Sequence, residues 1–288
     1  MSGERAFIDS LKALATDPAA RGLQDDCAVI ELGGETLVLT HDVMVEGVHT
    51  LPRQDRADIA WKLVTTNLSD LAAKGARPLG VLLGHMLGPD DERFVAGLTE
   101  VLTRYDVPLL GGDTVSGGPP RSWGLTAVGR ATHRPVPSRS GARPGDAIWV
   151  TGPLGAAMMG FEALRDGTDG DSTAFRRPLA CLAEGEVLAP LVSAMMDISD
   201  GLLLDASRMA DASETTIALL SADIPIAAPE NRRAEALRWG EDYELLFTLP
   251  AGVEPTVSAW RIGEVFERGE TSLLLDGKPP AEPFGYEH

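Results

Sequence analysis

Cysteine is scarce in this chain, with only Cys27 and Cys181 among 288 residues. The two stand far apart and form no CxxC pair, which argues against a disulfide framework and a thiolate zinc site. Long hydrophobic runs are also missing, so no segment predicts a membrane span, and the first residues lack the basic and apolar regions of a signal peptide. We therefore expect a cytoplasmic protein with both cysteines in its core.

Basic residues are few as well, with 25 Lys and Arg against 43 Asp and Glu, and the formal net charge is -18. Nucleic acid and anionic membranes bind clustered Lys and Arg, so this charge argues against both as partners. A polyphosphate ligand stays compatible with it if Mg²⁺ intervenes, because carboxylates and substrate oxygens are the usual ligands of that ion. The patterns GxSxG, HExxH and the Walker loop are absent.

The chain is organised around residues 58–75, where apolar residues recur with the helical period and Gly75 predicts the end of a helix. Asp70 falls within the apolar stripe of this helix rather than on its solvated face. A buried carboxylate needs a cation, and two are available: Lys74, four residues on, or a bound metal ion. The helix alone does not decide between them.

Further aspartates stand at the ends of predicted strands and helices. Asp26 opens one strand and Asp42 follows the next, so antiparallel pairing would bring the two side by side. Two glycines precede Asp113, where the backbone can approach a ligand closely. Asp197 and Asp200 stand at the start of a helix, where the N–H groups favour a phosphate or where Asp200 is simply an N-cap. Hard oxygen ligands in this number suit Mg²⁺ rather than zinc.

The order of the predicted elements indicates an α+β or mixed α/β protein of two domains. The first combines helices at 58–75 and 90–105 with strands at 25–30, 36–40, 79–86, 108–110 and 122–129. A segment rich in proline at 132–144 predicts a crossover between domains. The second combines a helix at 202–210 with strands at 147–150, 244–249, 261–265 and 271–275. We therefore divide the chain into residues 1–135 and 136–288.

Eight segments carry a resemblance that spans nearly the whole chain, in the order DDCAV, THDVMVEGVHT, NLSDLAAKGA, GGDTV, RSGARPGD, VTGPLG, DISDGLLLD and GEDYELLFT. Together they resemble the thiamine-monophosphate kinases, in the ATP-binding superfamily that also holds aminoimidazole ribonucleotide synthetase and selenophosphate synthetase. The Gly-Val-Gly-Thr-Lys loop of the synthetases and the reactive Cys of the selenium branch are absent. The resemblance implies the two-domain fold of that superfamily.

The resemblance also implies an enzyme in which ATP donates its γ-phosphoryl group to thiamine monophosphate, giving thiamine diphosphate and ADP. It implies several Mg²⁺ ions, no covalent nucleophile, and a homodimer formed through the N-terminal domains with their sheets paired. The matched metal positions are Asp26, Thr40, His41, Asp42, Asp70, Asp113, Asp197 and Asp200. The matched ATP contacts are Gly112, Asp113, Arg139 and Ser199. The matched substrate contacts are His49, Glu241 and Phe284.

Three positions depart from the family pattern. Gln24 and Trp239 each stand where glycine is usual, and His41 stands where Ser or Thr is usual beside Asp42. Imidazole is a poor Mg²⁺ ligand, so we expect His41 to contribute its backbone or nothing. Two other functions stay open: a related ATP-dependent synthetase with another acceptor, and a non-catalytic module that binds a divalent cation for stability.

Overall fold

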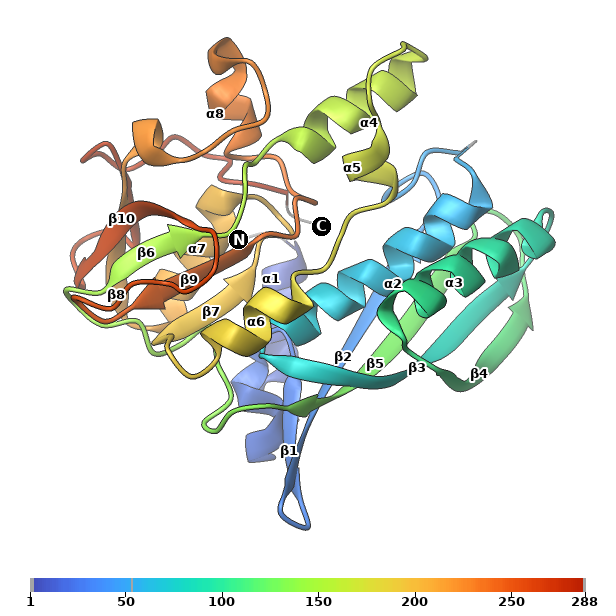
Figure 1. Cartoon of the computed structure of the whole chain (residues 1–288), viewed down its shortest axis with the longest axis horizontal. Helices are drawn as coiled ribbons and strands as arrows, with labels where there is room; N and C mark the ends of the chain where they lie inside the picture. The colour runs from blue at the N-terminus through green and yellow to red at the C-terminus, as the bar shows by residue number, and fades with distance from the viewer. Residues whose placement is uncertain (1–2, 53, 287–288) are drawn as a thin grey trace.

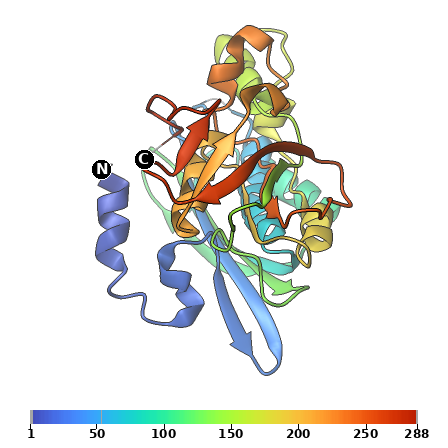
Figure 2. The same ribbon diagram turned by 90° about the vertical axis from the view of Figure 1, so that its left-hand side faces the viewer.

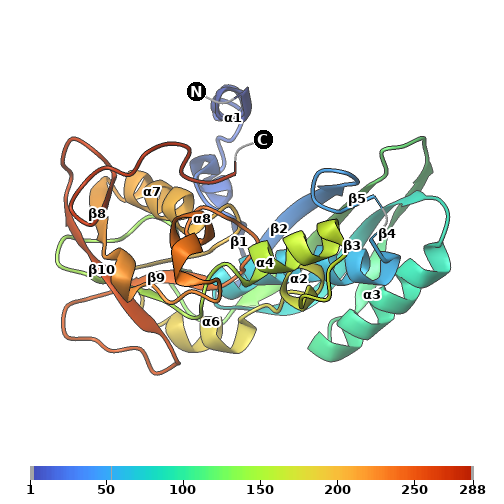
Figure 3. The same ribbon diagram turned by 90° about the horizontal axis from the view of Figure 1, so that it is seen from above.

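Two mixed sheets with helices form the computed structural model, which describes residues 3–52 and 54–286. The sheets lie toward opposite ends of the long axis, as Figures 1 and 3 show, with the N-terminal sheet and its helices on one side and the C-terminal sheet on the other. The chain passes from the first sheet to the second between Ala131 and Ala147. The boundary expected at residues 135 and 136 lies in this connection.

The N-terminal sheet has the strand order β1-β2-β5-β3-β4, antiparallel except for the parallel pair β3 and β4. Its strands are β1 (Ala28–Leu32), β2 (Glu35–Val45), β3 (Ala76–Leu87), β4 (Leu109–Ser116) and β5 (Ser122–Ala131). Gly33 and Gly34 join β1 to β2 with φ values of 57° and 89°, the two left-handed positions of a tight hairpin turn. One face of the sheet packs against α2 (Arg56–Ala73) and α3 (Asp91–Tyr105), as Figure 1 shows.

Helix α2 is buried on almost every side, which the sequence pattern did not predict. The predicted single apolar stripe faces the N-terminal sheet, but α2 also contacts α6 and β7 of the second domain. The polar side chains of a helix that is buried on all sides cannot reach water, so they need hydrogen-bond or ion-pair partners within the protein. It ends as predicted: Lys74 is the C-cap and Gly75 has φ 56°. A Cβ at Gly75 would lie 2.4 Å from the Cβ of Ala189, so the packing of α6 also requires glycine there.

The C-terminal sheet has the order β11-β8-β10-β6-β9-β7, antiparallel except for the pair β11 and β8. Its strands are β6 (Ala147–Val150), β7 (Ala194–Asp197), β8 (Thr215–Leu219), β9 (Leu245–Leu249), β10 (Trp260–Glu267) and β11 (Leu273–Leu275). The helices around it are α4 (Ala156–Asp166), α5 (Thr173–Arg176), α6 (Leu182–Leu188), α7 (Leu202–Ala212) and α8 (Arg233–Ala236). Short 3₁₀ turns are η2 (Ser221–Asp223) and η3 (Glu230–Arg232). Strands β6, β7 and β9 are fully buried, whereas β10 and β11 toward the other edge are partly exposed.

The N-terminal segment forms α1 (Gly3–Leu11) and the 3₁₀ turn η1 (Pro18–Leu23). Figure 2 shows both standing beside the two sheets rather than within either of them. Phe7 is 64% exposed and Leu14 is 76% exposed, so this segment leaves apolar surface open. Among the described helices, none is long and apolar enough to span a membrane.

Candidate active site between the two domains

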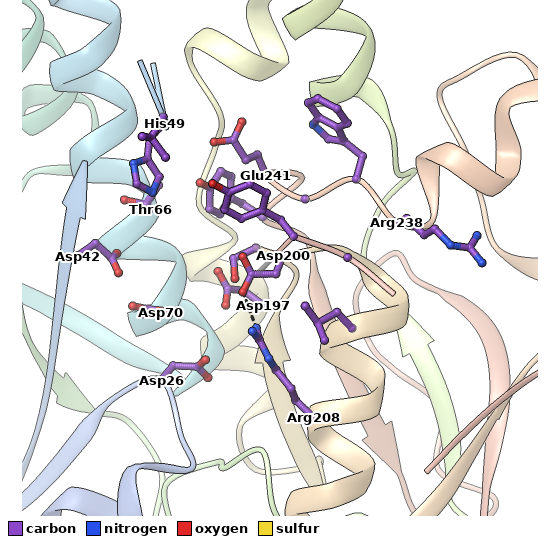
Figure 4. Close-up of a pocket in the computed structure, with 18 of the residues that line it drawn as sticks. Asp26, Asp42, His49, Thr66, Asp70, Asp197, Asp200, Arg208, Arg238 and Glu241 are labelled. Atoms are coloured by element: carbon purple, nitrogen blue, oxygen red, sulfur yellow. Dashed lines mark hydrogen bonds and ion pairs between the residues drawn. The ribbon is translucent and has the colours of Figure 1, made fainter. Parts of the chain in front are cut away.

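A cleft of 1480 Å³ lies where the two domains meet, and its lining residues come from both. Asp26, Asp42 and Asp70 line it from the N-terminal domain, and Asp197 and Asp200 line it from the C-terminal domain. Figure 4 shows these two groups on facing walls, with their carboxylates directed into the space between them. Five of the predicted metal-site aspartates are therefore brought to one cavity by the fold.

Three of these carboxylates lie close enough to share an ion. One oxygen each from Asp26, Asp70 and Asp197 lies within 4.8 Å of the others. Asp26 stands two residues before β1, Asp70 lies in the last turn of α2, and Asp197 is the last residue of β7. Each separation along the chain is tens of residues or more, so the trio exists only in the folded two-domain structure.

Neighbouring hydroxyl groups orient two of the three carboxylates. Thr40 of β2 donates a hydrogen bond through Oγ1 to Oδ2 of Asp70, and Ser69 donates through Oγ to Oδ2 of Asp197 at 2.6 Å. The alternation of β2 places Thr40 on its inner face toward α2. Ser69 is on α2 itself, so one helix both supplies Asp70 and positions Asp197 of the other domain.

The electrostatic field at Asp42, Asp70 and Asp197 strongly favours a cation. Burial raises the pKa of Asp42 to about 6, with the charge of Asp26 adding to the shift. Burial and the charge of Asp26 raise the pKa of Asp197 to about 7. Burial raises the pKa of Asp70 well above its usual range, and the charges of Asp42 and Asp197 raise it further. The charges of neighbouring carboxylates raise these pKa values, and a bound divalent ion would stabilise the same groups in their ionised form.

Asp25 and Asp26 have the opposite surroundings, because they contact cationic side chains of the protein. Lys74 Nζ lies 2.5 Å from Oδ1 of Asp25 and 2.8 Å from Oδ2 of Asp26, and Arg139 donates to Oδ1 of Asp26. Burial alone would raise the pKa of both carboxyl groups, but the adjacent cations hold both below the usual range. Lys74 therefore does not form the i,i+4 pair with Asp70 that the helix sequence allowed.

The chain matches known protein families over most of its length. Residues 24–131 match the N-terminal domain, and residues 143–276 the C-terminal domain, of AIR synthase related proteins. The thiamine-monophosphate kinase of Escherichia coli strain K12 is 38% identical over 264 residues, covering 85% of this chain and 80% of the relative. That of Aquifex aeolicus strain VF5 is 33% identical over 309 residues, covering 99% and 98%. The chain belongs to the thiamine-monophosphate kinase family.

Solved structures agree with this membership. AaThiL complexed with AMPPCP and TMP matches with a TM-score of 0.89 and 31% identity, over 99% of this chain and 97% of that one. The hydrogenase maturation protein HypE in complex with ATP shares the fold, with a TM-score of 0.73 at 21% identity. The family, the kinase class and the two-domain α+β fold predicted from the sequence are thereby confirmed.

The two residues that resemble family substrate contacts lie on opposite walls of the cleft. His49 follows β2 and accepts a hydrogen bond from the backbone N–H of Val45 through Nδ1 at 3.1 Å. Glu241 lies between α8 and β9, in a left-handed conformation with φ 67°. Figure 4 shows both labelled at the upper part of the cavity, above the aspartates. The fold thus separates a carboxylate region from a second region beside it.

Strand β2 runs farther than predicted, and this changes the positions of two predicted ligands. The predicted strand stopped at Thr40, whereas β2 pairs with β5 through Val45. Asp42 is therefore inside the strand rather than after it, and its neighbour His41 projects from the opposite face. The His41 side chain is exposed, and its Nδ1 lies 2.9 Å from Oγ1 of Thr126. Its imidazole accordingly lies away from the carboxylate trio.

Gly112 and Asp113 are not part of the cleft within this chain. Both lie on β4, whose residues are all exposed, and Oδ1 of Asp113 accepts a hydrogen bond from the N–H of Thr114. A Cβ at Gly112 would lie 1.9 Å from the carbonyl oxygen of Leu83, so the close packing of β3 against β4 accounts for that glycine. The expectation that Asp113 sits among the other aspartates was wrong for a single chain, because β4 is the edge strand farthest from β1.

The turn before α7 also differs from expectation. Neither Ser199 nor Asp200 caps this helix; Gly201 is its N-cap residue, and the carboxylate of Asp205 accepts the N–H groups of Ser199 and Asp200 at 3.2 and 3.1 Å. Asp200 instead receives a hydrogen bond from Arg208, as the dashed line in Figure 4 shows. Ser199 and Asp200 do line the cleft.

At the C-terminus, Phe284 packs against the hydrophobic core of the second domain, partly buried. The aromatic residue of this segment that lines the cleft is Tyr286, whose backbone N–H donates to the carbonyl oxygen of Asp200 at 3.0 Å. Residues two apart in an extended segment point to the same side, so backbone alternation does not explain why Tyr286 lines the cleft and Phe284 does not. The short tail has too little periodic pattern for the sequence to distinguish the two.

Sequence reasoning missed a set of aromatic residues that lines the cleft and a buried lysine behind the cleft wall. Phe161, Phe175 and Trp239 form an aromatic wall, with ring centroids 5.2 and 5.1 Å apart for the pairs that Phe161 makes. Lys62 is a fully buried lysine that contacts Glu241. The departure at Trp239 was a visible signal for the first set. Lys62 gave none, because a single lysine in a long helix ordinarily lies on its solvated side.

Proposed function

We propose that this protein transfers the γ-phosphoryl group of ATP to the phosphate of thiamine monophosphate, forming thiamine diphosphate and ADP. The observation that carries the proposal is the match, over 99% of the chain, to AaThiL complexed with AMPPCP and TMP, a nucleotide analogue and the acceptor. The cleft between the domains, with its facing carboxylates, supports the same reading. Direct transfer between the two phosphates requires no protein nucleophile.

The site also fits Mg²⁺. Asp26, Asp70 and Asp197 would hold an ion, because they present hard oxygen atoms within 4.8 Å of one another, and Asp42 and Asp200 offer further oxygens in the same cleft. Bound Mg²⁺ would offset the negative charge that builds on the transferring phosphoryl group. Thr40 and Ser69 keep the carboxylates of Asp70 and Asp197 in place.

For the nucleotide we assign Arg139 and Ser199. Arg139 lies beside the trio, and its Nε is buried and has no hydrogen-bond partner among the described residues, which leaves a donor for a phosphate oxygen. Ser199 lines the cleft between Asp197 and Asp200. Gly112 and Asp113 stay predictions as nucleotide contacts, since nothing in a single chain brings β4 to the cleft.

For the acceptor we assign His49 and Glu241, with the aromatic wall of Phe161, Phe175 and Trp239 beside them. The thiazolium ring of thiamine carries a positive charge, which a carboxylate and aromatic faces both favour. Tyr286 is the C-terminal aromatic residue that we place in this region in preference to Phe284.

We also propose that the protein is a homodimer formed through the N-terminal sheets. The face of this sheet away from α2 and α3 carries exposed apolar side chains at alternating strand positions, namely Ile30, Leu32, Val43, Leu82 and Val115. Exposed apolar surface of this extent is typical of an interaction site. Light scattering should give twice the chain mass, and Leu82→Lys should reduce it to one chain. The cytoplasmic location expected from the sequence stays a prediction.

A product assay tests the function. Purified protein is incubated with ATP and thiamine monophosphate, with and without MgCl₂, and ADP and thiamine diphosphate are quantified by chromatography. We expect the two products in equal amounts and only with the divalent cation. ADP and free phosphate without thiamine diphosphate would favour a synthetase with another acceptor. No turnover, with stabilisation by Mg²⁺ alone, would favour a non-catalytic metal module.

A further inference from the structure

Lys62 is a lysine of α2 without any exposed side-chain surface, and it connects both residues assigned to the acceptor. Its ammonium donates to Oε1 of Glu241 at 2.6 Å and to the backbone carbonyl oxygen of His49 at 3.3 Å. It also lies 3.8 Å from the centroid of the Phe175 ring. Three separate segments of the cleft wall therefore meet at a single positive charge.

Lys62 is buried more deeply than its partner Glu241. The Lys62 side chain is 0% exposed, whereas the Glu241 side chain is 22% exposed. Lys62 contacts Oε1, and Glu241 itself lines the cleft. An ammonium that is removed from water is costly to bury, and an apolar side chain of similar length could fill the same space. A role in stability alone does not account for it.

The backbone of Glu241 is fixed as well. Its N–H donates to the carbonyl oxygen of Ser199 at 2.8 Å, and its φ of 67° lies in a region that residues other than glycine seldom adopt. A Cβ on the preceding Gly240 would lie 2.1 Å from that same carbonyl oxygen. With the backbone held by the turn at Ser199, the direction of the Glu241 carboxylate depends on its side-chain partner, Lys62.

We propose that Lys62 is the positioning residue of the acceptor subsite: it fixes the direction of the Glu241 carboxylate and the position of the His49 loop for thiamine monophosphate. This proposal rests on the proposed function. Lys62 contacts none of the trio Asp26, Asp70 and Asp197, beside which the proposed function places the reacting phosphates. Its loss should therefore weaken acceptor binding while leaving the nucleotide site intact.

The test is Lys62→Met, with Asp58→Asn as a matched control. Asp58 lies one turn earlier on α2, is also buried, and also connects α2 to the α5 region through Arg176 and Arg177 at 2.6 and 2.5 Å. For Lys62→Met we expect the KM of thiamine monophosphate and its calorimetric Kd to rise about tenfold or more, with the KM of ATP unchanged. For Asp58→Asn we expect lower thermal stability and an unchanged acceptor KM. Equal acceptor KM values in Lys62→Met and wild type would overturn the proposal.

A double-mutant cycle separates positioning from general packing. If Lys62 acts through Glu241, then Lys62→Met should raise the acceptor Kd by less in a Glu241→Gln background than in wild type, because the carboxylate that it directs is already lost and only its contact with the His49 loop remains. Additive losses would overturn the proposal. Lys62→Arg keeps the charge and should retain more acceptor affinity than Lys62→Met. This charge-retaining variant provides the comparison if the methionine variant is unstable.

Product formation and acceptor binding by the wild-type protein distinguish failure of the Lys62 role from failure of the proposed function. Wild-type protein that forms no thiamine diphosphate and does not bind thiamine monophosphate by calorimetry would overturn both. Wild-type protein that forms the product, with Lys62→Met unchanged in acceptor Kd, would overturn only the role of Lys62.

Discussion

The carboxylates of the cleft fall into two neighbouring groups that differ in how their charge is balanced. One group, the paired side, consists of Asp25 and Asp26 with Lys74 and Arg139 against them. The other, the unpaired side, consists of Asp42, Asp70 and Asp197, near which the described residues place hydroxyl groups and further carboxylates. Adjacent cations lower the pKa of the first group, whereas burial and mutual repulsion raise the pKa of the second.

The chain supplies its own counterions on the paired side and depends on a ligand on the unpaired side. On the paired side, Lys74 and Arg139 allow two buried carboxylates to stay ionised without metal. On the unpaired side no such cation contacts Asp70 or Asp197 among the described residues, so a divalent ion would gain most there. Asp26 belongs to the paired side and to the trio, and it joins the two groups.

The largest expected effect comes from the centre of the unpaired side. Asp70→Asn keeps the shape of the side chain and removes one negative charge from a mutually repelling group. We expect turnover to fall by at least about a hundredfold, because a neutral amide holds Mg²⁺ poorly. The metal-free protein should be no less stable, since repulsion decreases. Turnover with and without MgCl₂ and a thermal melt in EDTA measure the two effects.

The control for this variant is Asp223→Asn, which removes an exposed charge from η2 outside the cleft lining. It should change neither turnover nor the melt. An Asp70→Asn variant that is destabilised in EDTA but keeps most of its activity would contradict the assignment of the unpaired side to metal.

A smaller effect is expected on the paired side. Lys74→Met leaves Asp25 and Asp26 with only Arg21 and Arg139 as counterions. Removal of one partner from a buried ion pair typically costs about 3–5 kcal/mol, and the remaining arginines should keep the loss toward about 2 kcal/mol. Urea unfolding in EDTA measures it, with Lys278→Met, an exposed lysine, as the matched control. Added Mg²⁺ should recover part of the loss; an unchanged midpoint would mean that the two sides do not differ in this way.

Local sequence rules predicted the elements but not their partners. Gly75 was recognised as the end of α2, and the β1–β2 hairpin followed from its glycine turn, because both depend on neighbouring residues. The partner of Lys74 was predicted less well. The i,i+4 rule offered Asp70, whereas the actual partners are 49 and 48 residues away in sequence. Spacing within a helix cannot show which chain segment covers it.

The same limit applies to the site. Five aspartates reach the cleft as their positions in the motifs suggested, but Asp113 does not, because its place on an edge strand depends on the order of strands in the sheet. Lys62 and Glu241 are 179 residues apart and belong to different domains. Their contact follows from the way the second domain packs on α2, which no periodic pattern in either segment records.

The smallest expected effect is a pH dependence that distinguishes the two sides in one experiment. The folded-state pKa values of Asp42, about 6, and Asp197, about 7, lie above the ordinary 3.8. Between about pH 4 and pH 7 the folded state therefore binds more protons than the unfolded state, and its stability falls as pH rises through that window. The lowered pKa values of Asp25 and Asp26 act below pH 4, where acid removes their stabilisation.

In EDTA, the Tm should thus fall between pH 5 and pH 7.5, since each such group loses about 1.4 kcal/mol per pH unit below its folded-state pKa and a chain of this size shifts by about 2–4 °C per kcal/mol. In excess MgCl₂ the fall should be smaller, because the ion binds the ionised carboxylates of the folded state. The difference between the two melts removes contributions from remote groups that do not bind the ion. Asp70→Asn should reduce that difference, whereas Lys74→Met should not reduce it. A Tm in EDTA that rises steadily from pH 5 to pH 7.5, parallel to the one in MgCl₂, would mean that the unpaired side is not repulsive when empty of metal.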